Sequence, residues 1–174
     1  MPSSRLWPQL AAAAGIPSSN GQVPPFTVTT LDGSTVTAES LTGKVVLVNF
    51  WATWCPPCRV EMPGFQQAHE RFGAEGFVVL GVTMDAGSPD RVRRFLEERN
   101  ITYPVAMATS QVVRDFGGVP FLPTSYLIDR DGRIRNEVRG MFTSVALEQA
   151  VERLLREPYS SRRHRSGEWS PAIE

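Results

Sequence analysis

The stretch that decides the fold is VNFWATWCPPCRVE, from Val48 to Glu61. It continues an apolar run, Val45–Trp51, whose β-branched and aromatic residues are typical of a buried strand. The second half holds both cysteines of the chain, Cys55 and Cys58, with two prolines between them. Beyond the prolines, apolar residues recur at helical spacing. The sequence therefore places the cysteine pair where a buried strand ends and a helix begins.

The composition is that of one ordinary globular domain. The chain has 174 residues, of which 41% are hydrophobic and 21% charged. Its 18 basic and 18 acidic residues cancel, so its charge gives no reason to expect nucleic-acid binding. No apolar run reaches the roughly 18 residues of a membrane span. We expect a flexible leader or the remnant of a trimmed anchor over residues 1–23, with a secretory signal as the alternative, one domain over 24–157, and a disordered polar tail over 158–174.

Alternation, turn signals and capping residues divide the domain into elements. A hairpin is expected over residues 26–37, around the turn Asp32-Gly33. The remaining pattern predicts strands at 44–51, 77–83, 101–106, 125–128 and 134–139, and helices at 56–73, after Ser88, at 110–116 and at 144–156. Strands that alternate with helices predict an α/β domain with a central mixed sheet covered on both faces.

The spacing of the two cysteines favours redox chemistry over a structural role. The ring that Cys55 and Cys58 would close is too small to stabilise the fold much. Cys55 lies at the helix N-terminus, where unpaired amides and the helix dipole stabilise an anion and lower a thiol pKa to roughly 3.5–7.5. Cys58 lies one turn deeper and should stay protonated. We therefore expect an exposed Cys55 to attack a disulfide and Cys58 to resolve the mixed disulfide.

Two further residues of this stretch bear on the same chemistry. Pro57 has no N–H, which removes one donor to the Cys55 thiolate. Glu61 follows Cys58 at i+3, on the same side of the helix. If Glu61 is partly buried, its pKa is raised and it can exchange a proton with Cys58. The alternative is an ordinary acid in the first turns of a helix, and the residues alone leave both interpretations open.

A zinc site is not expected. Structural zinc takes about four ligands, and this chain offers two thiols without a nearby pair of histidines. His69 and His164 are the only histidines and neither has metal-ligand spacing with the cysteines. We interpret His69 as a surface residue of its helix.

The segment WATWCPPCRVEMP resembles the active site of the thioredoxin superfamily, and more narrowly that of the TlpA/ResA-like thiol–disulfide oxidoreductases (a redoxin or AhpC/TSA-like domain). The stretch 119–129, VPFLPTSYLID, supports the resemblance because a Pro-Thr pair precedes a strand there. The resemblance covers residues 24–157. It implies a thioredoxin-like three-layer fold with an N-terminal β-hairpin and a central insertion at Met84–Ala106 that helps form a partner-facing surface.

The resemblance also implies a set of site residues. Pro123 matches a proline that is cis in this family and faces the cysteine pair. Thioredoxin carries a buried Asp where this chain has Asn49, which cannot titrate, whereas the ResA-like group carries a glutamate at the position of Glu61. The catalytic residues would then be Cys55, Cys58 and Glu61. The residues expected to bind the substrate protein are Trp54, Pro56, Pro57, Leu122, Pro123 and Thr124.

The function that follows is exchange of electrons with protein disulfides, without a cofactor or a metal. By resemblance we expect a reductase, with a role in cytochrome c maturation, an upstream electron donor, a monomeric state and a location in the periplasm or elsewhere outside the cytoplasm. One alternative is a peroxiredoxin-like thiol peroxidase, but the Pro-x-x-x-Thr-x-x-Cys pattern of such enzymes is incomplete here, since Thr53 stands two residues before Cys55 and the proline is absent. The other is a non-catalytic docking module with the same fold.

Overall fold

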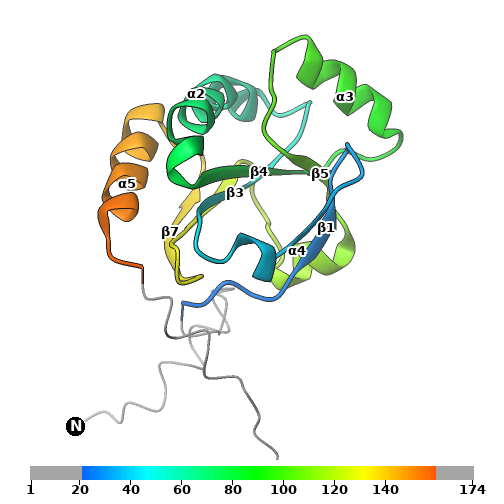
Figure 1. Cartoon of the computed structure of the whole chain (residues 1–174). Helices are drawn as coiled ribbons and strands as arrows, with labels where there is room; N and C mark the ends of the chain where they lie inside the picture. Colours follow the sequence, from blue (N-terminus) through cyan, green and yellow to red (C-terminus); the bar gives the residue numbers. More distant parts are fainter. Residues whose placement is uncertain (1–20, 160–174) are drawn as a thin grey trace, which may run out of the picture.

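The computed structural model describes residues 21–159, so the predicted leader and tail lie almost entirely outside the described range. Within it, a small hairpin and a five-stranded sheet are accompanied by helices (Figure 1). The strands are β1 (Thr27–Thr29), β2 (Thr35–Thr37), β3 (Val45–Trp51), β4 (Phe77–Thr83), β5 (Val105–Met107), β6 (Thr124–Ile128) and β7 (Ile134–Arg139). The helices are α2 (Pro56–Phe72), α3 (Pro89–Glu97), α4 (Ser110–Asp115) and α5 (Ser144–Arg156), with short 3-10 turns η1 (Glu39–Leu41) and η2 (Gly73–Glu75).

The sheet is mixed, as the alternating pattern predicted. Its strand order is β5-β4-β3-β6-β7, with β3 parallel to β4 and antiparallel to β6. All seven residues of β3 are buried, because both of its faces and both of its edges are covered. The central strand therefore delivers the cysteine segment, which directly follows it, from the middle of the molecule.

Helices and the hairpin cover opposite faces of this sheet, which gives three layers. On one face, α2 and α5 pack side by side, and α3 adds Val92 and Leu96 to the same core (Figure 1). On the other face, α4 and the β1–β2 hairpin contribute Val112, Phe26 and Val28 to a second core. This is the thioredoxin-like arrangement that the resemblance implied. No helix within residues 21–159 has the length and apolar character that crossing a bilayer requires.

The two edge strands of the sheet, β5 and β7, differ in what lies beside them. Beside β5, the hairpin covers the strand, and Leu31 N–H donates to the Val105 carbonyl at 2.7 Å, next to a bridge between Thr30 and Ala106. At the other edge, β7 has the sequence IRNEVR, with charged side chains at three of its six positions. The pairing of β7 with β6 is also irregular near Leu127.

The described elements agree with the predicted ones to within one or two residues, except at β5. The sequence predicts a strand over 101–106, but β5 begins only at Val105. The preceding residues make other contacts: Thr102 N–H donates to the side chain of Gln66 on α2 at 2.9 Å, and Pro104 has no N–H to give. The two short 3-10 turns were not predicted.

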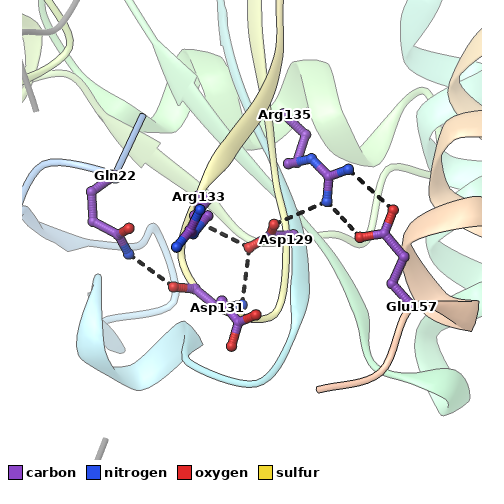
Figure 2. Close-up of polar contacts among 6 residues, drawn as sticks. All are labelled: Gln22, Asp129, Asp131, Arg133, Arg135 and Glu157. Carbon is purple, nitrogen blue, oxygen red and sulfur yellow. Dashed lines mark hydrogen bonds and ion pairs between the residues drawn. The ribbon is translucent and has the colours of Figure 1, made fainter. Parts of the chain in front are cut away.

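A polar cluster surrounds the turn between β6 and β7 (Figure 2). Asp129 accepts hydrogen bonds from the backbone N–H groups of Asp131 and Arg133, each at 3.0 Å, and so shapes the turn between β6 and β7. Arg135 donates to Asp129 at 3.1 Å and to Glu157, just beyond α5, at 2.5 Å. The hollow that these residues line has a volume of about 390 Å³. It lies at the start of β3, where Val46 pairs with Ile128, and thus away from the cysteines that follow the end of β3.

Candidate active site

Cys55 and Cys58 are joined in a disulfide, so the structure shows the oxidised form of the pair. Cys55 is the N-cap of α2, and Cys58 is the third residue of that helix. Cys55 is 4% exposed and Cys58 is completely buried. The predicted order of burial is therefore confirmed, but the expectation of an exposed Cys55 is wrong for this state. Cys55 and Cys58 belong to the same buried core cluster.

The first two residues of α2, Pro56 and Pro57, limit the donors at the helix N-terminus. The first amides of a helix have no partner within the helix and commonly face an anion. Here the first two positions have no N–H, and Arg59 N–H is taken by the Cys55 carbonyl at 3.2 Å. The Cys58 amide is therefore the first in the helix that is left to face the Cys55 sulfur.

Glu61 is buried one turn beyond Cys58, with 5% of its surface exposed. Its carboxylate accepts one hydrogen bond from the Asn49 side chain and one from the Phe142 backbone N–H, each at 3.0 Å. Burial raises the pKa of Glu61 to about 7, although both hydrogen bonds favour the charged form and act in the opposite direction. Glu61 is therefore not an ordinary exposed acid, and it can gain or lose a proton near neutral pH.

The loop before β6 lies beside the strand that leads to the cysteines. Thr124 pairs with Phe50 near the end of β3, so Pro123 sits next to the point where the chain turns toward Cys55. The Leu122–Pro123 peptide bond is cis, as the resemblance implied. The Pro123 carbonyl accepts from Gly140 N–H at 2.8 Å, and the Thr124 hydroxyl donates to the Phe121 carbonyl at 2.8 Å. These two hydrogen bonds hold the cis-proline loop in place.

Several large apolar side chains are exposed on the segments around the disulfide. Trp54 immediately precedes Cys55 and is 61% exposed, whereas Trp51 is completely buried in the core. The segments are held together by the Glu61–Phe142 and Pro123–Gly140 hydrogen bonds, which join α2, the cis-proline loop and the β7–α5 turn. Besides Trp54, the exposed apolar residues on and beside these segments are Val60 on α2, Phe121 in the cis-proline loop, Met141 in the β7–α5 turn and Val145 at the start of α5.

The structure adds a residue that the sequence analysis missed. Asp85, just beyond β4, accepts from the Thr53 N–H at 2.8 Å, from the Thr53 hydroxyl at 2.5 Å and from the Thr83 hydroxyl at 2.6 Å. These bonds fix the loop that carries Trp54 and Cys55 to the neighbouring strand. An available signal was the position of Asp85 after a buried parallel strand, since such strands end at the same edge of a sheet as β3.

His69 is placed differently from the prediction. It is half-buried, and its ring meets the edge of Tyr103 at a centroid distance of 6.2 Å. Burial lowers the pKa of His69. Among the described residues 21–159, no group of three or more His, Cys, Asp or Glu side chains is arranged to hold a metal ion.

Comparison with known proteins agrees with this geometry. Residues 20–137 match the AhpC/TSA family. The thiol-disulfide oxidoreductase ResA of Bacillus thuringiensis subsp. konkukian is 33% identical over 135 residues, which are 76% of each chain. A thiol:disulfide interchange protein of the thioredoxin family from Chlorobium tepidum has a similar structure, with a TM-score of 0.72 and 34% identity over 77% of this chain and 95% of that one. A secreted thiol-disulfide isomerase from Corynebacterium glutamicum has a TM-score of 0.72 and 27% identity, over 78% of this chain and 86% of that one.

Proposed function

Since this chain belongs to the AhpC/TSA family and to its ResA-like thiol–disulfide oxidoreductases, we propose that it works as a reductase of protein disulfides. Thiol–disulfide exchange with protein thiols follows from the family. The direction of electron flow is our proposal. The observation that carries it is the Cys55–Cys58 pair at the N-terminus of α2, one turn away from a buried glutamate.

The proposed reaction begins with the reduced pair. The Cys55 thiolate attacks one sulfur of the substrate disulfide, a mixed disulfide forms, and the other substrate sulfur leaves as a thiolate that takes a proton from solvent. Cys58 then gives its proton to the Glu61 carboxylate and attacks Cys55, which releases the second substrate sulfur as a thiolate. That thiolate is protonated from Glu61 or solvent. The substrate gains two electrons and two protons, and the enzyme becomes the disulfide seen here. No cofactor takes part, but a dithiol donor must reduce the enzyme again.

The prolines at the helix start favour the reductase direction. A disulfide is a strong oxidant when its reduced form is stabilised. Because Pro56 and Pro57 supply no N–H to the Cys55 thiolate, the reduced form receives less stabilisation than a helix with free amides would give. The reduced pair should therefore be easily oxidised and should donate electrons to partner proteins.

We assign the partner-binding surface to the residues around the disulfide. Trp54, which is exposed, and Leu122, which is half-buried, offer apolar contacts, as do the rings of Pro56 and Pro57. Pro123 and Thr124 are themselves buried, so we propose that they shape the loop that an incoming peptide meets. The location outside the cytoplasm, the monomeric state and a role in cytochrome c maturation belong to the same proposal. For the location, support comes from the Corynebacterium glutamicum protein, which is described as secreted.

A peroxidase function receives less support from the site. The Thr53 hydroxyl, two residues before Cys55 and not three as in the peroxidase pattern, donates to Asp85. Turnover of hydrogen peroxide by the reduced protein alone, at a rate exceeding its exchange with protein disulfides, would favour the peroxidase. Unchanged biological activity in a Cys55→Ser variant would favour a non-catalytic docking module.

The decisive experiment is trapping. In a Cys58→Ser variant, Cys55 can attack but the mixed disulfide cannot be resolved, so covalent complexes with substrate proteins should accumulate and be identified by mass spectrometry. Cys55→Ser is the matched control and should trap little. Equal trapping by both variants, or by neither while the parent protein is active, contradicts the assigned roles.

A further inference from the structure

The Asn49 side chain is buried in β3, where it is a polar group in an otherwise apolar strand. It is 1% exposed, and its Nδ2 group donates to two side chains at once, to Glu61 Oε1 and to Ser125 Oγ, each at 3.0 Å. Its neighbours along β3, Val48 and Phe50, are apolar and point to the opposite face of the sheet. Asn49 is therefore the group through which the central strand contacts the carboxylate.

The orientation of the Asn49 amide leaves its oxygen without a hydrogen bond from the described residues, and this cost indicates that the orientation has a role. Within the described part of the chain, Asn49 Oδ1 is buried and has no hydrogen-bond partner. Buried polar atoms are nearly always paired, and the exceptions tend to occur at functional sites. The unpaired oxygen follows from directing both N–H bonds of the amide toward Glu61 and Ser125. Ser125, on the neighbouring strand β6, fixes that orientation because its hydroxyl accepts the second N–H.

We propose that Asn49 is a positioning residue for disulfide exchange: it holds the Glu61 carboxylate one turn from Cys58 and favours its charged, proton-accepting form. Ser125 supports it by fixing the amide. A glutamate as deeply buried as Glu61 would otherwise remain protonated at neutral pH and could not accept the proton of Cys58. This inference rests on the proposed proton-transfer role of Glu61.

Among the groups that face Glu61, Asn49 is the one that can be replaced to change the proton affinity of the carboxyl group. From α2 itself comes Cys58, which carries no charge in the disulfide. From the β7–α5 turn comes the Phe142 backbone N–H, which only a substitution by proline would remove. From the segment before β5 comes Tyr103, which burial keeps neutral. Asn49 is thus the side chain whose replacement should change the proton affinity of Glu61 without adding a charge.

The test is a carboxyl titration of the oxidised full-length protein by ¹³C NMR, with the Glu61 signal assigned through its loss in Glu61→Gln. The Asn49→Leu variant removes a hydrogen bond to a charged group, so the pKa of Glu61 should rise by about one unit. The pH profile of mixed-disulfide resolution should shift in the same direction. Ser125→Ala keeps the amide but loosens it, and should raise the pKa by less. It also serves as the second variant if Asn49→Leu does not fold.

Val48→Ala is the matched control, because it weakens the packing of the same strand on the opposite face. It should leave the Glu61 titration unchanged. An unchanged titration in both Asn49→Leu and Ser125→Ala, or an equal shift in Val48→Ala, overturns the inference. The proposed function has a separate test: if Asn49→Leu shifts the titration but Glu61→Gln leaves exchange unaltered, Asn49 controls Glu61 and the proton-transfer role of Glu61 is wrong.

Discussion

The Glu61 carboxyl group is surrounded by donors and still keeps its proton to an unusually high pH. Two hydrogen bonds stabilise its charge, from Asn49 and from the Phe142 backbone, but the loss of solvent has the larger effect. The native protein therefore binds this proton more tightly than the unfolded chain does. The consequence reaches beyond catalysis, because any difference in proton affinity between the two states makes stability depend on pH.

We expect Glu61→Gln to change the pH dependence of unfolding. In the parent, the favourable contribution of the Glu61 proton is complete below the ordinary pKa of 4.5 and is lost as the pH rises to about 7. The difference in unfolding free energy between parent and variant should therefore fall by about 3 kcal/mol over this window, at 1.36 kcal/mol for each pKa unit. Urea unfolding of both oxidised proteins between pH 4 and 8 measures it. Parallel curves would contradict the raised pKa.

Pro57 should set part of the redox potential. Replacing Pro57 with Ala returns an N–H to the second position of α2, where it can stabilise the Cys55 thiolate. We expect the pKa of Cys55 to fall and the reduction potential to become less negative by up to about 30 mV, the equivalent of roughly 1.4 kcal/mol for two electrons. Equilibration with glutathione measures the potential. A shift to a more negative value would be the wrong sign for this explanation.

At the level of elements, the position of Glu61 depends on how closely α2 and α5 pack. Gly64 on α2 faces Ser144 at the start of α5, and a Cβ at Gly64 would lie 2.7 Å from the Ser144 Cβ. Since Phe142 precedes α5 by two residues, the same contact determines where the Phe142 N–H meets Glu61. A helix–helix distance thus controls one of the two hydrogen bonds of the site.

Gly64→Ala should destabilise the protein by about 1–3 kcal/mol, because neither Cβ lies at the flexible end of a side chain. Gly73→Ala is the matched control: Gly73 has an ordinary φ of −56° and open space around it, so the substitution should be neutral or slightly stabilising. Thermal unfolding compares the two. Adding Ser144→Gly to Gly64→Ala should recover part of the loss, and an absence of recovery would show that the contact is not the cause.

The elements themselves were largely predictable from the sequence, and the contacts between them were not. The buried run before Cys55, the capping Ser88 and the turn at Asp32-Gly33 are local signals, and each predicted element appears in the structure. The β5 boundary failed because Thr102 pairs with Gln66, which is 36 residues earlier in the chain. For the same reason Asp85 was missed, since its partner Thr53 comes from another strand-end loop.

Within the site, the role and the burial of a residue could be predicted from the sequence only where they follow from its position along one helix. The N-cap position of Cys55 and the deeper position of Cys58 follow from the order of the residues along one helix. The residues left two interpretations for Glu61, and the choice required the segment around Phe142, which is 81 residues away. The same holds for His69, whose ring contacts Tyr103 from the segment before β5.

Across the molecule as a whole, the disulfide and the polar cluster around Asp129 lie at opposite ends of β3. The disulfide follows the end of β3, and the Asp129 cluster lies beside the start of that strand (Figure 2). The ion pairs of Arg135 with Asp129 and Glu157 are partly exposed, so they contribute little beyond fixing the end of α5 to the sheet. Changes at one end should therefore not reach the other.

Asp129→Ala should separate stability from activity. It leaves the N–H groups of Asp131 and Arg133 without their acceptor in the β6–β7 turn, which should cost about 1–3 kcal/mol of unfolding free energy. The rate of disulfide exchange, measured well below the melting temperature, should stay unchanged. Glu157→Gln is a milder companion, with an expected loss below about 1 kcal/mol. A large drop in exchange rate for either variant would show that the two ends are coupled.

The closed edge beside β5 and the charged edge at β7 have a consequence for the clients of such a protein. A sheet with a bare, apolar border invites extended chains to add to it as further strands and then to aggregate. Here one border is sealed by the protein's own N-terminal hairpin, and the other presents Arg135, Glu137 and Arg139. An extended segment of a substrate protein should therefore not add to this sheet as a further strand, and the substrate can dissociate once disulfide exchange is complete.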